Sequence, residues 1–159
     1  MKLTKAAEVT LATVESCTAG ALAVLLADAP DAGKRFHGGF VVYTKQNKTA
    51  ALGVPPPLIA AQSAVSSDVA KAMASGALDR CHAHISLAIT GVAGPEPDED
   101  GNPVGLVYVA VAAKSGLVKA IECKFSQLSR EEIRDRSMAA ALTLLETVLS
   151  EQIDLTGNP

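Results

Sequence analysis

Three residues with reactive or capping side chains stand together in the stretch ESCTAG, residues 15–20. A β-branched run precedes this stretch and a helix-forming run follows it. We therefore expect Ser16 to lie at the carboxyl end of a strand, where open α/β sheets place their ligands. Backbone N–H groups at the start of the next helix can hold an anion or a developing oxyanion. The alternative is structural, with Ser16 or Thr18 only capping that helix.

One thiol and three histidines are the other candidate reactive groups. Thiolates near helix N-termini are acidified, which makes Cys17 a candidate nucleophile. Small buried cysteines are common, however, and the sequence singles out no histidine partner, so we rank Cys17 below Ser16. His37, His82 and His84 show no metal-ligand spacing. We expect no metal ligands and no cofactor.

The stretch YTKQNK, residues 43–48, offers a base for the serine. If Thr44 caps a helix, Lys48 lies in its first turns, where the helix dipole and burial both disfavour the ammonium form. A neutral lysine can deprotonate a serine without a histidine. The alternative is a solvated surface lysine, which is the common fate of this residue type.

Two further stretches could hold an anionic part of a ligand. In TGVAGP, residues 90–95, Gly91 and Gly94 would let the backbone approach a ligand closely, although a tight structural turn would look the same. Arg130 and Arg134 lie one turn apart at the start of the last helical segment. A guanidinium there suits a phosphate or carboxylate, and the alternative is exposed pairing with neighbouring acids.

Strand-like and helical segments alternate around these residues. The expected strands are 9–15, 36–44 with a bulge at 38–39 or a bent hairpin, 84–90, and a hairpin of 104–113 and 116–125. The expected helices are a segment opened by residues 18–20 and ended at 29–30, then 45–52, 66–78 and about 130–150. Residues 54–58 (VPPPL) read as a rigid connector and 154–159 as a frayed tail. This order predicts an α/β fold: one three-layer α/β/α domain over residues 1–159, on a mixed, partly parallel sheet with a C-terminal hairpin and helix.

Composition excludes several classes of protein. The chain has 159 residues, of which 48% are hydrophobic and 19% charged, and a net charge of −3, so we expect a globular protein without a basic field for nucleic acid or membranes. Aromatic residues make up only 3%, too few for base-stacking platforms. Three cysteines without framework spacing suit a reducing cytoplasm, and no uninterrupted apolar run approaches the roughly 18 residues of a membrane span. We expect a cytoplasmic protein that forms a closed homo-oligomer.

Blocks of sequence in one order carry a resemblance to a known family. They are ESCTAG, YTKQNK followed by LGV, AVSSDVAKAMASG, TGVAGP with GNPVG, and FSQLSREEIR, which together span roughly residues 11–149. In combination they resemble the CinA C-terminal domain family, the nicotinamide-nucleotide amidases. The resemblance implies an α/β/α fold. It also implies hydrolysis of the carboxamide of nicotinamide mononucleotide to nicotinic acid mononucleotide and ammonia, without a metal.

The resemblance also implies roles for single residues. Ser16 resembles the family's nucleophile, and Tyr43 and Lys48 resemble its activating partners. Thr90 and Arg130 match a site threonine and a site arginine. The expected substrate contacts are Glu15, Thr18, Gly20, Thr90, Gly91, Gly94 and Arg130. Among these, donors near residues 18–20 would hold the oxyanion, and Arg130 with the loop 90–94 would bind the phosphate.

The chain departs from the family pattern at several positions. Ala19 stands where the family often has glycine, Gly33 where it commonly has serine, and Lys45 where asparagine is frequent. Glu96 and Pro97 replace the usual glycines. The changes at Ala19, Gly33 and Glu96 keep open the hypothesis of a nucleotide-binding or partner-binding module that retains the pocket without turnover. A third hypothesis, which does not rest on these changes, is a thiol enzyme that uses Cys17.

Overall fold

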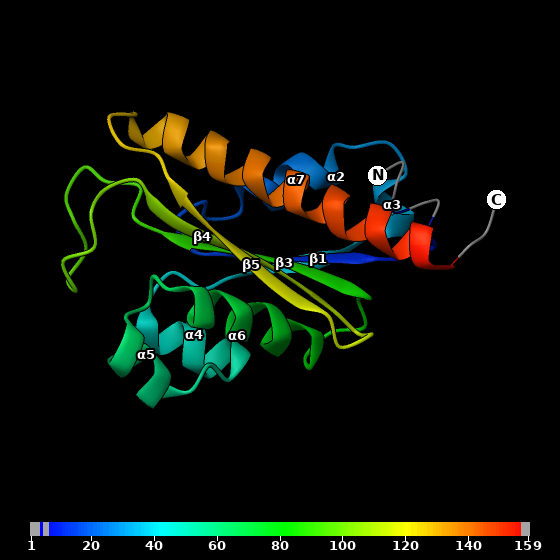
Figure 1. Ribbon diagram of the computed structural model, residues 1–159, viewed down its shortest axis with the longest axis horizontal. Coiled ribbons are helices and arrows are strands. Elements are labelled where there is room, and N and C mark those ends of the chain that lie inside the picture. Colours follow the sequence, from blue (N-terminus) through cyan, green and yellow to red (C-terminus); the bar gives the residue numbers. More distant parts are fainter. Residues whose placement is uncertain (1–3, 5–6, 157–159) are drawn as a thin grey trace.

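The chain folds around one five-stranded mixed sheet (Figure 1), and the computed structural model describes residue 4 and residues 7–156. The strands are β1 (Leu11–Glu15), β2 (Phe36–Val41), β3 (Ile85–Gly91), β4 (Leu106–Ala113) and β5 (Val118–Lys124). Their order in the sheet is β2-β1-β3-β4-β5. β1 runs parallel to both β2 and β3, whereas β4 and β5 complete the sheet as an antiparallel hairpin. The predicted mixed sheet with a C-terminal hairpin is confirmed.

Helices cover both faces of this sheet, which confirms the three layers (Figure 1). One face carries α2 (Ala21–Ala27), α3 (Ala32–Arg35) and the long α7 (Arg130–Thr156). The other carries α4 (Lys45–Leu52), α5 (Pro56–Gln62) and α6 (Ser67–Leu78). Side chains of the central strands alternate between the two layers. Leu87 of β3 packs in the core under α7, and its neighbour Ala88 packs in the core under α6.

Four expectations about the elements were wrong in detail. α5 begins inside the VPPPL stretch, because Pro56 and Pro57 occupy the first helical turn, where a missing N–H costs no hydrogen bond. The short α3 was not expected. β2 is confirmed as a strand with an irregular register, but the register shift with β1 lies between residues 36 and 38, one residue before the expected bulge, and the strand ends at Val41 rather than at residue 44. α7 continues past residue 150, so 154–156 are helical, and the rest of the expected tail lies outside the described residues.

Candidate functional site

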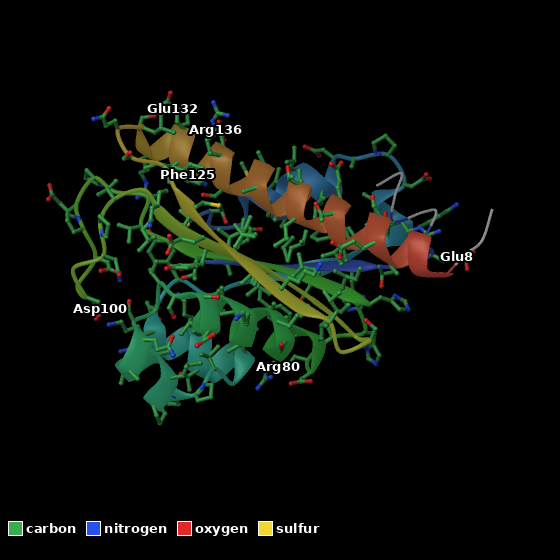
Figure 2. The ribbon with its side chains drawn as sticks, in the orientation of Figure 1. Glu8, Arg80, Asp100, Phe125, Glu132 and Arg136 are labelled. Atoms are coloured by element: carbon green, nitrogen blue, oxygen red, sulfur yellow. The ribbon has the colours of Figure 1, made fainter. Side chains whose placement is uncertain are left out.

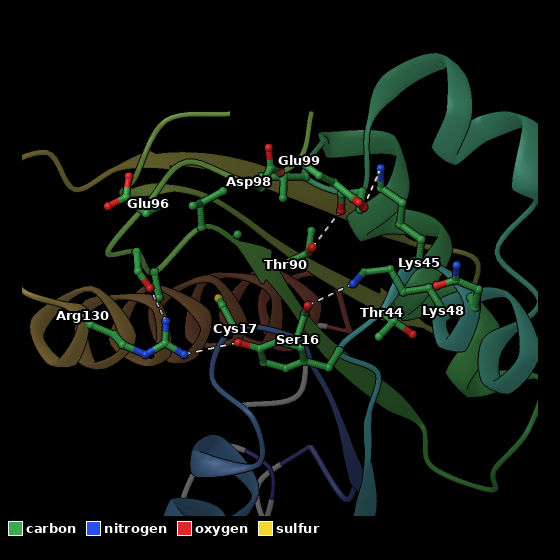
Figure 3. A pocket seen from close by; sticks show the side chains of 18 residues that line it. Ser16, Cys17, Thr44, Lys45, Lys48, Thr90, Glu96, Asp98, Glu99 and Arg130 are labelled. Atoms are coloured by element: carbon green, nitrogen blue, oxygen red, sulfur yellow. Dashed lines mark hydrogen bonds and ion pairs between the residues drawn. The ribbon is translucent and has the colours of Figure 1, made fainter. Parts of the chain in front are cut away.

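Three parallel strands end at the same edge of the sheet, and the segments that follow them meet there. Glu15, the last residue of β1, pairs with Val41 of β2 on one side and Ile89 of β3 on the other. The chain leaving each of these strands therefore borders one cavity of about 410 Å³ (Figure 3). Seven of the ten predicted site residues line it: Ser16, Tyr43, Lys48, Thr90, Gly91, Gly94 and Arg130.

A buried lysine contacts the predicted nucleophile. Lys48 Nζ lies 2.9 Å from Ser16 Oγ, and it also donates to the carbonyl oxygen of Val42 at 3.1 Å (Figure 3). Thr44 begins α4 as its cap, accepting the N–H of Asn47 at 3.1 Å, and this start places Lys48 on the inner side of the first turns. Lys48 is only 2% exposed, so the expectation of a solvated surface lysine is excluded.

Burial changes the acidity of this lysine. The pKa of Lys48 falls from 10.5 to about 8, chiefly because the ammonium loses its hydration, and the nearby charge of Lys45 lowers it further. A minor but substantial fraction of the Lys48 side chain is therefore the neutral amine near pH 7. The amine can accept the Ser16 proton while its hydrogen bond to the Val42 carbonyl holds it in place.

The capping role proposed for Ser16 or Thr18 belongs instead to Glu15. The cap position of α2 is Gly20, without a side-chain cap from its own residue. The fully buried carboxylate of Glu15 accepts the N–H groups of Gly20 at 3.0 Å, Leu22 at 3.0 Å and Ala23 at 2.8 Å. Ser16 is thus free of the helix end. Glu15, expected to contact the substrate, turns toward the helix, because three orphan donors at its first turn need an acceptor.

The same hydrogen bonds correct the expected oxyanion site. Thr18 and Gly20 do not line the cavity. The N–H of Gly20 is taken by Glu15, the N–H of Ala19 donates to the Ser16 carbonyl at 3.1 Å, and Arg134 occupies the Thr18 carbonyl at 2.9 Å. The turn after β1 therefore positions the serine but uses the N–H groups of Ala19 and Gly20 for its own closure.

Ala19 in this turn has a left-handed backbone, with φ of 52°. A residue with a Cβ in that region destabilises the folded state by roughly 1–2 kcal/mol. Glycine avoids this strain, but its larger entropy in the unfolded chain lowers the free energy of unfolding by about 0.5–1 kcal/mol. We expect Ala19→Gly to raise the free energy of unfolding by about 0.5–1 kcal/mol, measured by chemical denaturation. Ala23→Gly, inside α2, should lower it by a similar amount. Destabilisation by both changes would show that the turn stores no strain at Ala19.

Tyr43 lines the cavity, but its hydroxyl bonds to a different partner from the one expected of an activating residue. Its side chain is 55% exposed, and its hydroxyl accepts a hydrogen bond from Arg130 at 3.3 Å. Arg130 also donates to the carbonyl oxygen of Gly94 (Figure 3). In the part of the chain that the structure describes, Tyr43 thus pairs with the arginine rather than with Ser16 or Lys48.

Two of the predicted loop residues are required by the fold itself. Thr90 is buried and donates its hydroxyl to the Ala64 carbonyl at 2.8 Å. A Cβ on Gly91 would lie 2.6 Å from Val107 Cγ2 and 2.8 Å from the Leu106 carbonyl, so only glycine lets β4 approach. Gly91 lines the cavity as predicted, but the close approach of β4 is enough to explain why this position is a glycine.

Acidic residues that sequence reasoning did not assign to the site form one rim of the cavity. Glu96, Asp98 and Glu99 line it, together with Lys45, whose ammonium contacts Glu99 at 2.9 Å and Asp100 at 2.6 Å. The Lys45 ammonium holds the pKa of Asp100 below its usual range. The acidic run PDED could have indicated this rim, but it is far from Ser16 in the sequence, and no local pattern places it beside the serine. The cavity therefore combines Arg130 with an acidic rim.

The remaining candidates have structural roles. Cys17 is buried, and burial raises the pKa of its thiol to about 11, so little thiolate forms at neutral pH. His84 Nδ1 lies 2.9 Å from the hydroxyl of Thr10 and accepts its N–H at 3.1 Å. Among the described residues there is no cluster of three or more side chains that could hold a metal ion. Within the same residues, no helix combines the length and apolar character needed to cross a membrane.

Comparisons with known proteins agree on one family. The profile of the CinA C-terminal domain matches residues 1–149. A CinA-like protein of Mycolicibacterium gilvum is 46% identical over 143 residues, which are 89% of this chain and 33% of that protein. A CinA-like protein of Acidobacterium capsulatum is 42% identical over 135 residues, 85% of this chain and 32% of that one. The chain thus spans about a third of these curated relatives.

Solved structures show the same fold. A competence-damaged protein (CinA) superfamily protein from Escherichia coli aligns with a TM-score of 0.88 and 38% identity, covering 92% of this chain and 84% of that chain. One from Klebsiella pneumoniae aligns with a TM-score of 0.90 and 31% identity, covering 94% and 92% respectively.

Proposed function

The chain belongs to the CinA C-terminal domain family, and from this and the contact between Ser16 and Lys48 we propose that it is a serine amidase acting on the carboxamide of nicotinamide mononucleotide. The observation that carries the proposal is the buried pair at 2.9 Å. A lysine with a lowered pKa against a serine hydroxyl has the geometry of a nucleophile and its general base.

The reaction proceeds through an acyl-enzyme. The Lys48 amine takes the Ser16 proton as Oγ attacks the carboxamide carbon, and the resulting ammonium returns a proton to the departing nitrogen. The C–N bond breaks and ammonia leaves. A water molecule, deprotonated by the same amine, then cleaves the ester, releases nicotinic acid mononucleotide and regenerates Ser16. No step needs a metal or a cofactor.

The charges of the cavity support a substrate that carries both signs. A nicotinamide mononucleotide has a cationic ring and an anionic phosphate. Arg130 offers guanidinium donors for the phosphate, and the acidic rim of Glu96, Asp98 and Glu99 offers a favourable field for a cation. Of the departures from the family pattern, Gly33 lies in α3 outside the cavity, so it removes no ligand group from the lining.

Ammonia release tests the proposal directly. Purified, folded protein incubated with nicotinamide mononucleotide should yield ammonia and nicotinic acid mononucleotide in equal amounts. Folded protein that yields neither product contradicts the amidase assignment. If the nucleotide still raises the melting temperature of that inactive protein, the domain is a binding module. Glu96, which lines the cavity where the family usually has glycine, favours this alternative.

Arg130→Gln should raise KM for the nucleotide about 10- to 100-fold, because a charge-assisted hydrogen bond to phosphate is lost. KM for nicotinamide riboside, which has no phosphate, should change far less. Arg136→Gln is the matched control, since Arg136 is exposed on the same helix, points away from the sheet (Figure 2) and is not among the residues that line the cavity. Equal effects on nucleotide and nucleoside would mean that Arg130 serves only to hold Gly94 and Tyr43.

A further inference from the structure

The hydroxyl hydrogen of Thr90 is already committed inside the protein. Thr90 is the penultimate residue of β3 and 1% exposed, and it lines the cavity near Ser16 (Figure 3). Its Oγ1 lies 2.8 Å from the carbonyl oxygen of Ala64. A carbonyl oxygen carries no hydrogen, so the hydroxyl must be the donor in this contact. The oxygen of Thr90 then has only lone pairs left for another partner.

The Ala64 carbonyl that takes this hydrogen is held in a constrained turn. Ser63, just before it, has φ of 70° and ψ of 161°, a region that is almost confined to glycine. The side-chain amide of Asn102 donates to Ser63 Oγ at 2.7 Å, and Ser66 Oγ donates to the Ser63 carbonyl at 3.3 Å. Asn102 is itself fixed by Asp98 at 2.7 Å. The acidic loop therefore stabilises the turn that orients the Thr90 hydroxyl.

We propose that Thr90 is a specificity-determining residue that selects a carboxamide over a carboxylate, because its committed hydroxyl can act toward the ligand only as an acceptor. A carboxamide nitrogen has two hydrogens to donate, whereas an ionised carboxylate has none and meets the Thr90 oxygen as a second acceptor. The inference rests on the proposed function, since it concerns the amide substrate and the acid product of that reaction. The site would therefore bind the amide substrate more tightly than the acid product.

Equilibrium binding in a Ser16→Ala background separates recognition from turnover. In that background, the dissociation constants of nicotinamide mononucleotide and nicotinic acid mononucleotide are measured by calorimetry. The parent should prefer the amide. Adding Thr90→Val, which keeps the shape but removes the hydroxyl, should weaken amide binding about tenfold without weakening acid binding. Thr90→Ser, which keeps the hydroxyl, should retain the preference.

A second variant guards against a folding defect in Thr90→Val. Asn102→Ala leaves Thr90 in place but releases Ser63, so it should lower the ratio of amide to acid affinity part of the way toward that of Thr90→Val. An unchanged ratio in folded Thr90→Val and Asn102→Ala overturns the inference, and so does a folded parent that binds neither nucleotide. The proposed function fails separately, if wild-type protein releases no ammonia, and a Thr90-dependent ratio in that protein would still support the inference.

Discussion

Replacing Ser16 with alanine is expected to lower the rate of ammonia release at least ~10³-fold. Among the described residues, the Ser16 hydroxyl is the only hydroxyl that is hydrogen-bonded to the Lys48 amine. The fold should be retained, since Glu15 rather than Ser16 caps α2 and the hydrogen bond from the Ser16 N–H to the Ile89 carbonyl of β3 is unchanged. The measurement is kcat for nicotinamide mononucleotide, with the melting temperature of the same preparation.

Cys17→Ala is the matched control for this variant. Cys17 is the next residue, borders the same cavity and is equally buried, but burial raises its pKa to about 11 and disfavours the thiolate. Most of the activity should therefore remain. The reverse pattern, with activity lost in Cys17→Ala and kept in Ser16→Ala, would identify a thiol enzyme and contradict the serine mechanism.

Replacing Lys48 with methionine should abolish activity and at the same time stabilise the protein at pH 7. The pKa of Lys48 is 10.5 when unperturbed and about 8 in the folded state, so below pH 8 the folded protein bears the full cost of burying an ammonium. This difference corresponds to about 3 kcal/mol. Methionine removes that cost but leaves the Val42 carbonyl without its donor, which offsets part of the gain. We expect a net gain of about 1–2 kcal/mol.

The pH dependence of the free energy of unfolding tests whether the burial of the Lys48 ammonium causes this difference. Between pH 8 and 10.5 the unfolded chain binds more protons at this residue than the folded chain, so wild-type stability rises with pH relative to Lys48→Met. Urea denaturation of both proteins at pH 7 and pH 10 should show the advantage of methionine shrinking or reversing. A difference that is the same at both pH values would show that Lys48 carries no burial penalty. The wild-type kcat/KM should rise with pH through about 8, as the amine of the free protein becomes neutral.

Lys45→Met provides the contrast on the same helix. The hydrogen bonds that the Lys45 ammonium donates to Asp100 and Glu99 raise the pKa of Lys45. Its contribution to stability is therefore present at neutral pH and is lost as the pH rises through that raised pKa, opposite to Lys48. Because the ion pairs are partly exposed, methionine at residue 45 should change stability little. Stabilisation at pH 7 equal to that of Lys48→Met would mean that the effect comes from added apolar surface.

The sequence by itself determined the features that depend on neighbouring residues. The run before ESCTAG and the helix formers after it placed Ser16 at the end of a strand, and Thr44 ahead of KQNK placed Lys48 near the start of a helix. These follow from propensity and capping, which act over a few residues. The same local reasoning failed at VPPPL, where prolines suited to a connector are equally suited to the first turn of α5.

Only the tertiary structure decided which of these groups meet. Ser16 and Lys48 are 32 residues apart, and Tyr43 and Arg130 are 87 apart, so no local pattern specifies either contact. The order β2-β1-β3 creates the first contact, because it brings the ends of three parallel strands to one edge of the sheet. The second also needs the β4-β5 hairpin, which returns the chain to the same edge before α7 begins. Burial there lowers the pKa of Lys48, and it directs the Glu15 carboxylate to the N–H groups at the start of α2. Both outcomes depend on removing charged groups from water, which the folded chain does and the sequence alone does not.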